Sequence, residues 1–535
     1  MRTTYYNGVV YTGGGWADSF TVENGKFTRV GQDGQFPADA GDAVDLGGRF
    51  VCAGFNDSHM HLLNLGHVLS MAQLSAHTDS LAGMLDYLCD YIAETNPPEG
   101  AWVLGRGFNH DYFRDERRFP TRWDLDRVST VYPICITRAC GHICVVNSKA
   151  LEVLGIDRST PQPEGGQFAF DENGELLGQF FENALNLVME RMPVPNIEEI
   201  KRMLRLSSAL LNRYGITSCH SDDYDAFPGV SWKTVAGALE ALADAGELTV
   251  RVNEQAQFKT PDALRGYIES GAFHHRSALF KSGPLKMIGD GSLGAHTAFL
   301  SRPYADAPET RGIPIYTQAQ LDEMVDCANR NGMSVAIHAI GDAALDRVLD
   351  AIEKALAACP RENHRHGIVH CQITRPDQLA RIRKMHLHVY TQSVFLDYDT
   401  TIVRARVGDT LAETSYAAKS LLSGGVSVSN GSDSPVEAPD VLRGIECAVT
   451  RRSVGSTDAP YRPEEALTVQ EAIDSFTQGS AYASFEENLK GRIAENMLAD
   501  FVVLERNPFE TPPEQLHTIA VLETYLGGRR VYKKA

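Results

Sequence analysis

Apolar runs that end in polar residues recur through the middle of the chain, and helix-like segments follow most of them. One such segment is 344–358, which follows Gly341. Alternating strand and helix patterns predict a parallel sheet. The runs are residues 49–56, 215–220, 248–253, 285–288, 334–337, 367–369, 388–392 and 426–430. Eight such runs predict an α/β fold, a (β/α)₈ barrel of the TIM type.

One connection breaks the rhythm of the predicted barrel. Residues 57–214 separate the first run from the second, which is far more chain than one βα unit needs. We therefore expect an inserted subdomain at about residues 70–195. Its predicted segments are a helix at 80–92, the stretch 102–113, and a helix at 196–214 that leads back to the barrel.

Both ends of the chain contain short β-rich segments separated by Gly and Asn turns. Examples are Val9-Val10-Tyr11 near the start and 500–504 near the end. These patterns are typical of antiparallel strands. We expect residues 1–48 and 489–535 to form one small β-sandwich, with the barrel at 49–488 between them.

Composition excludes several classes of protein. Fifty basic and 69 acidic residues give a net charge of -19, which opposes binding to nucleic-acid phosphates. The chain lacks both a signal-peptide core and an apolar stretch of membrane-spanning length, so we expect a cytoplasmic protein without membrane attachment. The ten cysteines show no CxxC spacing and are predicted to be reduced. The expected partner is a small-molecule substrate, and a homodimer is left open.

Histidine and aspartate residues follow several of the predicted strands. His59 and His61 follow the first run at a spacing that places both side chains on one face of an extended chain. His338, His370 and Asp433 follow later runs. Because active sites of barrels form at the carboxyl ends of the strands, these five side chains should converge. Imidazoles and a carboxylate suit Zn²⁺ or a similar divalent ion that activates a water molecule.

The spacing of His59 and His61 is weak evidence by itself, because the chain contains three HxH pairs. The pair His364/His366 lies in a charged stretch, and His386/His388 opens the seventh run at the opposite end of the barrel. We expect these two pairs to be structural or solvated. His338 or His370 alone would be interpreted as an interior histidine, but their joint placement favours a metal site.

Lys286 ends the fourth run, on the same rim. An ammonium group directed at a cation would be repelled unless its pKa falls and it reacts with CO₂ to form a carbamate. The carbamate would bridge two metal ions. Alternatively, the lysine reaches solvent or pairs with Asp290. One or two divalent ions per chain are compatible with this pattern.

The strings 54–61 (GFNDSHMH) and 431–435 (GSDSP), with Lys286, His338 and His370, resemble the amidohydrolase superfamily. More narrowly, the chain resembles the amidohydrolase family 3 branch, which includes N-substituted formamide deformylases. The resemblance covers nearly the whole chain and includes residues 105–108, 140–142, 147–151, 290–294, 370–372 and 499–504. Two positions depart from it: His296 stands where relatives usually have arginine, and a usual glycine is replaced near Asn496. The first departure could alter substrate choice.

The resemblance implies hydrolysis of an amide-like C–N bond by a metal-activated water, with Asp433 as both ligand and catalytic base. Glu182 matches a glutamate often found in relatives. It is the alternative to Lys286 as a bridge between metals, unless it is a solvated carboxylate at a helix start. Further candidates for substrate or metal contacts, or for second-layer positions behind the ligands, are His142, His220, His296, Phe108 and Gln392.

The expected substrate is an N-formyl or short N-acyl amide with an apolar substituent on nitrogen. The apolar substituent is suggested by the aromatic residues Trp102, Phe108, Tyr112 and Phe113, which would suit a lid. A lactonase, esterase or ring deaminase on the same barrel stays open. A scaffold that has lost catalysis is a third alternative, but it predicts missing ligands, and every expected position is filled.

Overall fold

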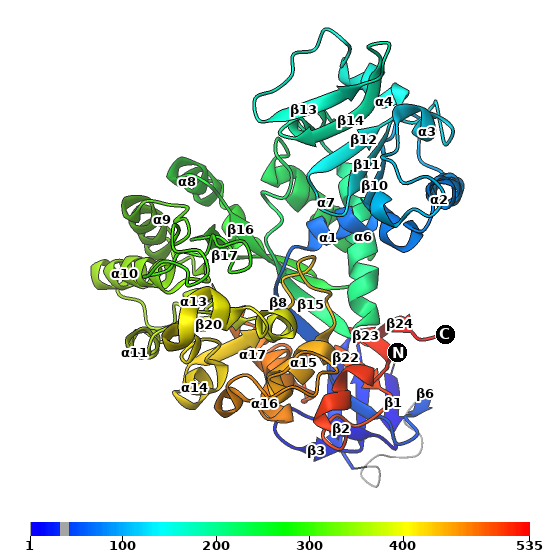
Figure 1. Cartoon of the computed structure of the whole chain (residues 1–535). Helices are drawn as coiled ribbons and strands as arrows, with labels where there is room; N and C mark the ends of the chain where they lie inside the picture. The colour runs from blue at the N-terminus through cyan, green and yellow to red at the C-terminus, as the bar shows by residue number, and fades with distance from the viewer. Residues whose placement is uncertain (1, 33–41) are drawn as a thin grey trace. The chain divides into compact units, whose positions relative to one another are not determined.

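A computed structural model describes residues 2–32 and 42–535. The chain divides into two compact units (Figure 1). One is Gly66–Asn196, and the other contains the chain up to Leu65 together with Ile197–Ala535. The larger unit holds the barrel and the sandwich of chain ends, and the smaller unit is the insertion between the first and second barrel strands.

The larger unit is built on an eight-stranded sheet in the order β21-β20-β19-β18-β17-β16-β15-β8. Every neighbouring pair in this order is parallel. The two end strands also contact each other, so the sheet is a nearly closed barrel and the predicted fold is confirmed. The strands are β8 (Phe55–Met60), β15 (Ile216–Ser221), β16 (Arg251–Gln257), β17 (Phe280–Ile288), β18 (Val335–Ala339), β19 (Gly367–His370), β20 (His388–Thr391) and β21 (Ser427–Asn430).

Helices follow the barrel strands, as the sequence pattern predicts. The cap of α9 shows why one of them begins where it does: Thr317 and Gln320 form a reciprocal capping box. The main helices are α6 (Ile197–Arg213), α7 (Trp232–Asp244), α8 (Pro261–Glu269), α9 (Gln318–Arg330), α10 (Asp342–Ala358), α11 (Pro376–Lys384), α14 (Ala418–Ser423), α15 (Val441–Thr450), α16 (Val469–Ser475) and α17 (Gln478–Ala483). Helix α6 packs on α7 and β15 and belongs to the barrel unit. This differs from the expectation that it is a segment of the insertion.

The first predicted run, 49–56, proves to be the end of one sheet and the start of another. Strand β7 (Phe50–Ala53) pairs with β2 (Val9–Tyr11) and β22 (Phe501–Leu504) in the sandwich. The barrel strand β8 begins only at Phe55. Gly54 makes the change possible, because a Cβ atom there would lie 2.3 Å from Thr217 Oγ1. His59 therefore lies within the first barrel strand and not after it.

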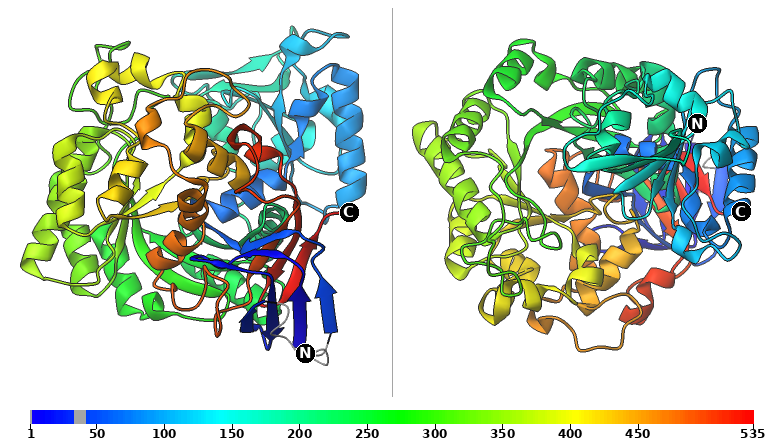
Figure 2. Two further views of the ribbon diagram at one scale, coloured as in Figure 1. Left: turned by 90° about the horizontal axis from the view of Figure 1, so that it is seen from below. Right: turned by 45° about the horizontal axis from the view of Figure 1, so that its top comes forward.

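The two chain ends form a β-sandwich, as expected from their strand patterns. Its sheets have the orders β5-β4-β1-β6 and β24-β23-β22-β7-β2-β3, and Figure 2 shows the N-terminal strands beside the C-terminal ones. The remaining strands are β1 (Arg2–Tyr6), β3 (Trp16–Ala17), β4 (Ser19–Glu23), β5 (Lys26–Gly31), β6 (Asp42–Asp45), β23 (Val521–Leu526) and β24 (Arg529–Lys533). Tyr5 stacks on Phe20 and Phe501 on Tyr525, with centroid separations of 4.9 and 4.3 Å. Residues 33–41 of the predicted module lie outside the described residues.

Asp500 joins the sandwich to the barrel. Its carboxylate accepts two hydrogen bonds from the Arg251 guanidinium, at 2.7 and 2.9 Å, and both side chains are buried. Such a bidentate pair fixes orientation as well as contact. Nearby, Asn496 adopts a left-handed conformation with φ of 71°, which explains how asparagine replaces the glycine usual near this position.

The unit Gly66–Asn196 contains a sheet of order β13-β14-β12-β11-β10-β9. Its elements are β9 (Ala72–Gln73), α2 (Leu81–Thr95), β10 (Val103–Phe108), α3 (Arg122–Asp126), β11 (Ile134–Arg138), β12 (Ile143–Val146), α4 (Ser148–Leu154), β13 (Gly166–Phe170), β14 (Leu176–Glu182) and α5 (Leu185–Met189). Phe108 and Phe113 are fully buried in its hydrophobic core. They stabilise this unit, and a substrate contact at Phe108 stays a prediction.

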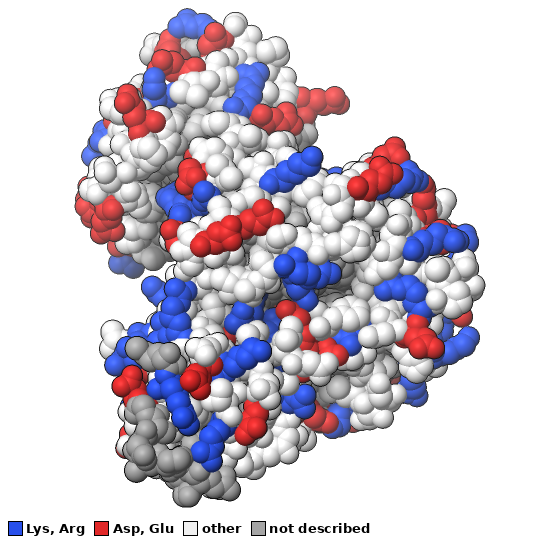
Figure 3. Space-filling view, turned by 180° about the vertical axis from the view of Figure 1, so that it is seen from behind, with Lys and Arg blue, Asp and Glu red and all other residues white. Residues whose placement is uncertain are grey.

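The surface carries charges of both signs. On the face in Figure 3, Lys and Arg side chains are mixed with Asp and Glu side chains. Within residues 2–32 and 42–535, no helix combines the length and the hydropathy of a membrane-spanning segment.

Candidate metal centre

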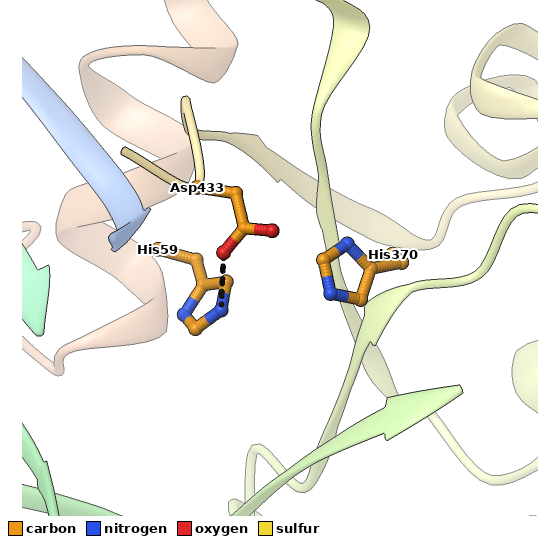
Figure 4. Close-up of side chains that lie close together, drawn as sticks. All are labelled: His59, His370 and Asp433. Carbon is orange, nitrogen blue, oxygen red and sulfur yellow. Dashed lines mark ion pairs between the residues drawn. The ribbon is translucent and has the colours of Figure 1, made fainter. Parts of the chain in front are cut away.

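His59, His370 and Asp433 come together at the carboxyl ends of β8, β19 and β21 (Figure 4). One ligand atom from each lies within 4.8 Å of the others, and all three residues are buried. Asp433 Oδ1 is 3.3 Å from His59 Nε2 and 2.9 Å from His61 Nε2. These separations are short enough for His59, His370 and Asp433 to share one ion, with His61 beside the same carboxylate.

A second group shares His59 and adds an aspartate that sequence reasoning missed. Asp222 follows β15, and its carboxylate contacts His61 Nδ1. Lys286 Nζ lies 2.8 Å from Asp222 Oδ2 and 3.1 Å from His59 Nε2. Lys286 is therefore directed into the site, and its partner is Asp222 and not Asp290. The chain could hold two neighbouring ions here, with His59 close to both.

Oxygen acceptors behind three of the histidines determine which ring nitrogen faces the site. The Nδ1 atoms of these histidines lie 2.9 Å from Gln255 Oε1 for His59, 2.9 Å from Asp290 Oδ1 for His338, and 2.7 Å from Gln392 Oε1 for His370. An acceptor at this distance holds a proton on Nδ1 and leaves the Nε2 lone pair free, as in most metal-binding histidines. The donor set therefore fits a divalent metal ion.

His338 lies beside His370, which in turn lies beside His59. Their ring centroids are 4.5 Å apart, and those of His370 and His59 are 5.7 Å apart. Asp290 also accepts hydrogen bonds from the backbone amides of Ile340 and Gly341, so its carboxylate is rigidly held beside His338. The structure thus brings together His59, His61, Lys286, His338, His370 and Asp433. Their roles as ligands stay a prediction.

The buried charges of the site shift one another's pKa values. Burial would raise the pKa of Asp433, but contacts with His59 and His61 hold it well below its usual value. Burial would lower the pKa of His61, but Asp222 and Asp433 raise it to about 10. Burial and the nearby Lys286 charge lower the pKa of His59. The Asp433 carboxylate therefore stays ionised, as a carboxylate ligand of a metal must be.

The backbone around Asp433 is held in an uncommon conformation. Asp433 has a φ of 59° and His370 a φ of 74°, in the left-handed region that non-glycine residues rarely adopt. The Asp433 amide donates to the His59 carbonyl at 2.8 Å. A Cβ atom at Gly431 would lie 2.6 Å from the His59 backbone nitrogen. This close approach requires glycine and places the two ligand strands side by side.

Three further sequence candidates in the barrel unit have other surroundings. His220 is fully buried, and neither of its ring nitrogens has a partner among the described residues. It lies two positions before Asp222 on the same strand face, so Asp222 reaches the rim in its place. His296 pairs with Asp306 at 3.1 Å in the loop after β17. Gln392 orients His370.

The candidates in the smaller unit pair with each other. His142 Nδ1 lies 2.8 Å from Glu182 Oε2, and both side chains are exposed. Glu182 has a φ of 51° at the end of β14, so it does not begin a helix. Its part in binding a metal or substrate stays a prediction.

The other two HxH pairs are largely structural, as expected. His364 is buried and bonds to the Met385 carbonyl, and His366 is buried beside Asn329. His388 is buried and hydrogen-bonds Ser427 and Ser429. His386 is exposed.

Comparisons with known proteins agree with this architecture. The model of the amidohydrolase family matches residues 42–532. A protein of Bacillus subtilis (strain 168) named as an amidohydrolase, YtcJ, is 33% identical over 551 residues and covers 100% of both chains. An N-substituted formamide deformylase of Arthrobacter pascens is 27% identical over 546 residues, which is 97% of this chain and 95% of that protein.

A solved structure gives the same result for the fold. The uncharacterized metal-dependent hydrolase from Pyrococcus furiosus superposes with a TM-score of 0.79 at 28% identity. The match covers 95% of this chain and 100% of that chain. The family resemblance found from the sequence motifs is confirmed.

Proposed function

Because the chain belongs to the amidohydrolase family and is a metal-dependent hydrolase, we propose that it cleaves a non-peptide C–N bond in an N-formyl or short N-acyl amide. The observation that carries the proposal is the set of three histidines with Nδ1 engaged by oxygen acceptors, two of which, His59 and His370, lie beside the Asp433 carboxylate. The similar deformylase supports an amide as the substrate.

Zinc is the metal we propose, because imidazole-rich sites with a carboxylate suit it. His59, His61, His338, His370 and Asp433 would hold it, with Lys286 as a carbamate bridge if two ions bind. A bound divalent ion would polarise the substrate carbonyl and lower the pKa of a water molecule.

Asp433 is the residue we assign to proton transfer. Its Oδ1 atom lies between the rings of His59 and His61, and the carboxylate is ionised and able to accept a proton. It would take the proton of the attacking water and deliver it to the leaving nitrogen. His59 and His370 are buried, which limits competing solvent on that side of the carboxylate.

The structure gives less support for an apolar substituent on the amide nitrogen than the sequence does. Phe108 and Phe113, two of the aromatic residues that suggested an apolar group, are core residues of the smaller unit. Tyr112 is exposed. We therefore propose only the formyl or short acyl side of the amide at this point.

The purified protein is expected to contain one or two divalent ions per chain. His59→Ala should lose most of this metal, because both candidate groups include His59. Metal content can be measured by inductively coupled plasma mass spectrometry. His386→Ala is a matched control, since His386 is an exposed histidine of another HxH pair. Full metal content in the His59 variant would contradict the assignment.

A substrate panel tests the reaction class. It contains N-formyl amides, short N-acyl amides, lactones, esters and amino-heterocycles, each assayed for kcat/KM with the zinc-loaded protein. An N-formyl or short N-acyl amide should be the best substrate. If a lactone, an ester or a ring deamination outpaces every amide, the proposed function is wrong, although the metal site could still stand.

A further inference from the structure

A cavity adjoins the metal centre on the side of β19 and β20. The residues that line it include His370, Gln372, Gln392, Leu396, Tyr416 and Arg451. About 20 Å³ is open to the centre of a water molecule, and the cavity with the open space that leads to it encloses about 360 Å³. The smaller value gives room for about one water-sized polar group, and the larger value includes open solvent.

Arg451 is an unusual member of this wall, because its charge is buried without a carboxylate partner. The residue is 2% exposed and directly follows α15. Its Nε atom donates to the Tyr461 carbonyl at 3.0 Å, whereas Nη2 has no partner in the part of the chain that the structure describes. Arginine is rarely buried to this extent unless it is paired.

The nearby acidic residue Glu465 does not fill this role. Its carboxylate accepts hydrogen bonds from the Ser420 amide at 2.9 Å and from Arg462 at 3.2 Å. Within residues 2–32 and 42–535, Arg451 forms no ion pair at 4.0 Å or less. Burial lowers the pKa of Arg451 to about 10, which still leaves the guanidinium charged near neutral pH. An anionic ligand would relieve the cost of burying this charge.

Gln372 adds an acceptor to the same cavity. Its Nε2 atom donates to Asp399 Oδ2 at 3.0 Å, and Tyr416 donates to the same oxygen at 2.6 Å. These hydrogen bonds fix the side-chain amide of Gln372. Its Oε1 atom has no hydrogen-bond partner among the described residues. The cavity therefore offers a cationic donor at Arg451 and a neutral acceptor at Gln372.

We propose that this cavity is a substrate subsite for a carboxylate group, with Arg451 as the residue that determines specificity for it. The inference rests on the proposed amide hydrolysis. It adds that the nitrogen substituent of the amide is acidic, with the ligand N–H facing Gln372 Oε1 and the carboxylate accepting from Arg451. Leu396 and Leu421 line the same cavity and would contact the apolar part of the substituent.

A matched pair of substrates tests this subsite. N-formylphenylalanine and N-formyl-2-phenylethylamine differ only in the carboxylate. The wild-type protein should show at least about a tenfold higher kcat/KM for the acid, since a hydrogen bond to a charged group contributes about 1.5–3 kcal/mol. Arg451→Met should abolish this preference, with the larger loss of kcat/KM on the acid. Arg451→Lys should retain part of it.

Binding to the metal-free protein gives a readout that needs no turnover. After chelation and at constant ionic strength, acetate should raise the melting temperature of the wild-type protein more than acetamide does. The difference should vanish in Arg451→Met. Without anion, this variant should be at least as stable as the wild type, because methionine removes an unpaired buried charge. A large loss of stability would indicate a structural role for Arg451 and overturn the proposal.

The two measurements separate the subsite from the reaction. If both substrates are cleaved equally well and Arg451→Met changes neither rate, the carboxylate subsite is wrong and amide hydrolysis stands. If neither amide is cleaved but the acetate effect depends on Arg451, the anion site stands and the proposed reaction fails. An acetate effect that persists in Arg451→Met would place the anion elsewhere and overturn the subsite.

Discussion

Asp433→Asn is expected to lower kcat by at least about a hundredfold, because an amide cannot accept the proton that a carboxylate accepts. Asparagine has nearly the same shape, so the fold should persist. The backbone hydrogen bond from the Asp433 amide to the His59 carbonyl should also persist. Steady-state kinetics would give the rate, and metal analysis would show whether binding is retained.

Asp262→Asn is the matched control for this change. Asp262 is an exposed aspartate at the start of α8, and a surface substitution of this kind should alter neither rate nor stability appreciably. If Asp433→Asn keeps its activity within about tenfold while the control behaves as wild type, the general base lies elsewhere.

The barrel and most of its rim could be predicted because each strand carries its own signal. An apolar run followed by a polar residue marks the carboxyl end of a strand wherever it occurs. His338, His370 and Asp433 each follow such a run, so no knowledge of strand pairing was needed to bring them to one face.

The residues behind the ligands could not be found in the same way. Gln255 and Asp290 support His59 and His338 from strands or loops that are distant in sequence. These contacts depend on the register between neighbouring strands, which a single sequence does not specify. Asp222 illustrates the same limit: period-two alternation places His220 and Asp222 on one face but does not tell which one reaches the rim.

The other differences between the sequence prediction and the structure arise from local features of the chain. Gly54 divides one apolar run between two sheets, because the chain passes Thr217 too closely for any side chain at that position. Phe108 follows a pattern that suits a lid as well as a core, and burial distinguishes the two only once the sheet of its own unit is formed.

Lys286→Ala is expected to lower kcat by more than about a hundredfold and to remove one metal ion per chain. Lys286 Nζ lies 2.8 Å from Asp222 and 3.1 Å from His59, so its head is among the proposed ligands. An ammonium group about 4 Å from a dication would be repelled by several kcal/mol even at an effective dielectric of 20. Reaction of the neutral amine with CO₂ forms a carbamate and releases a proton, which converts the repulsion into attraction.

Three measurements test the role of Lys286. A short carboxylic acid such as propionate should partly restore activity to Lys286→Ala by occupying the vacated bridge, and ¹³C-bicarbonate should give a carbamate resonance in the wild type. Lys354→Ala, at an exposed lysine, should change neither activity nor metal content. If Lys286→Ala keeps both metals and Glu182→Gln loses one, the bridge is Glu182. If the metal-loaded wild type shows no such resonance, Lys286 is not a carbamate. Lys286 would then not be the bridge, because an unmodified ammonium group cannot bridge two cations.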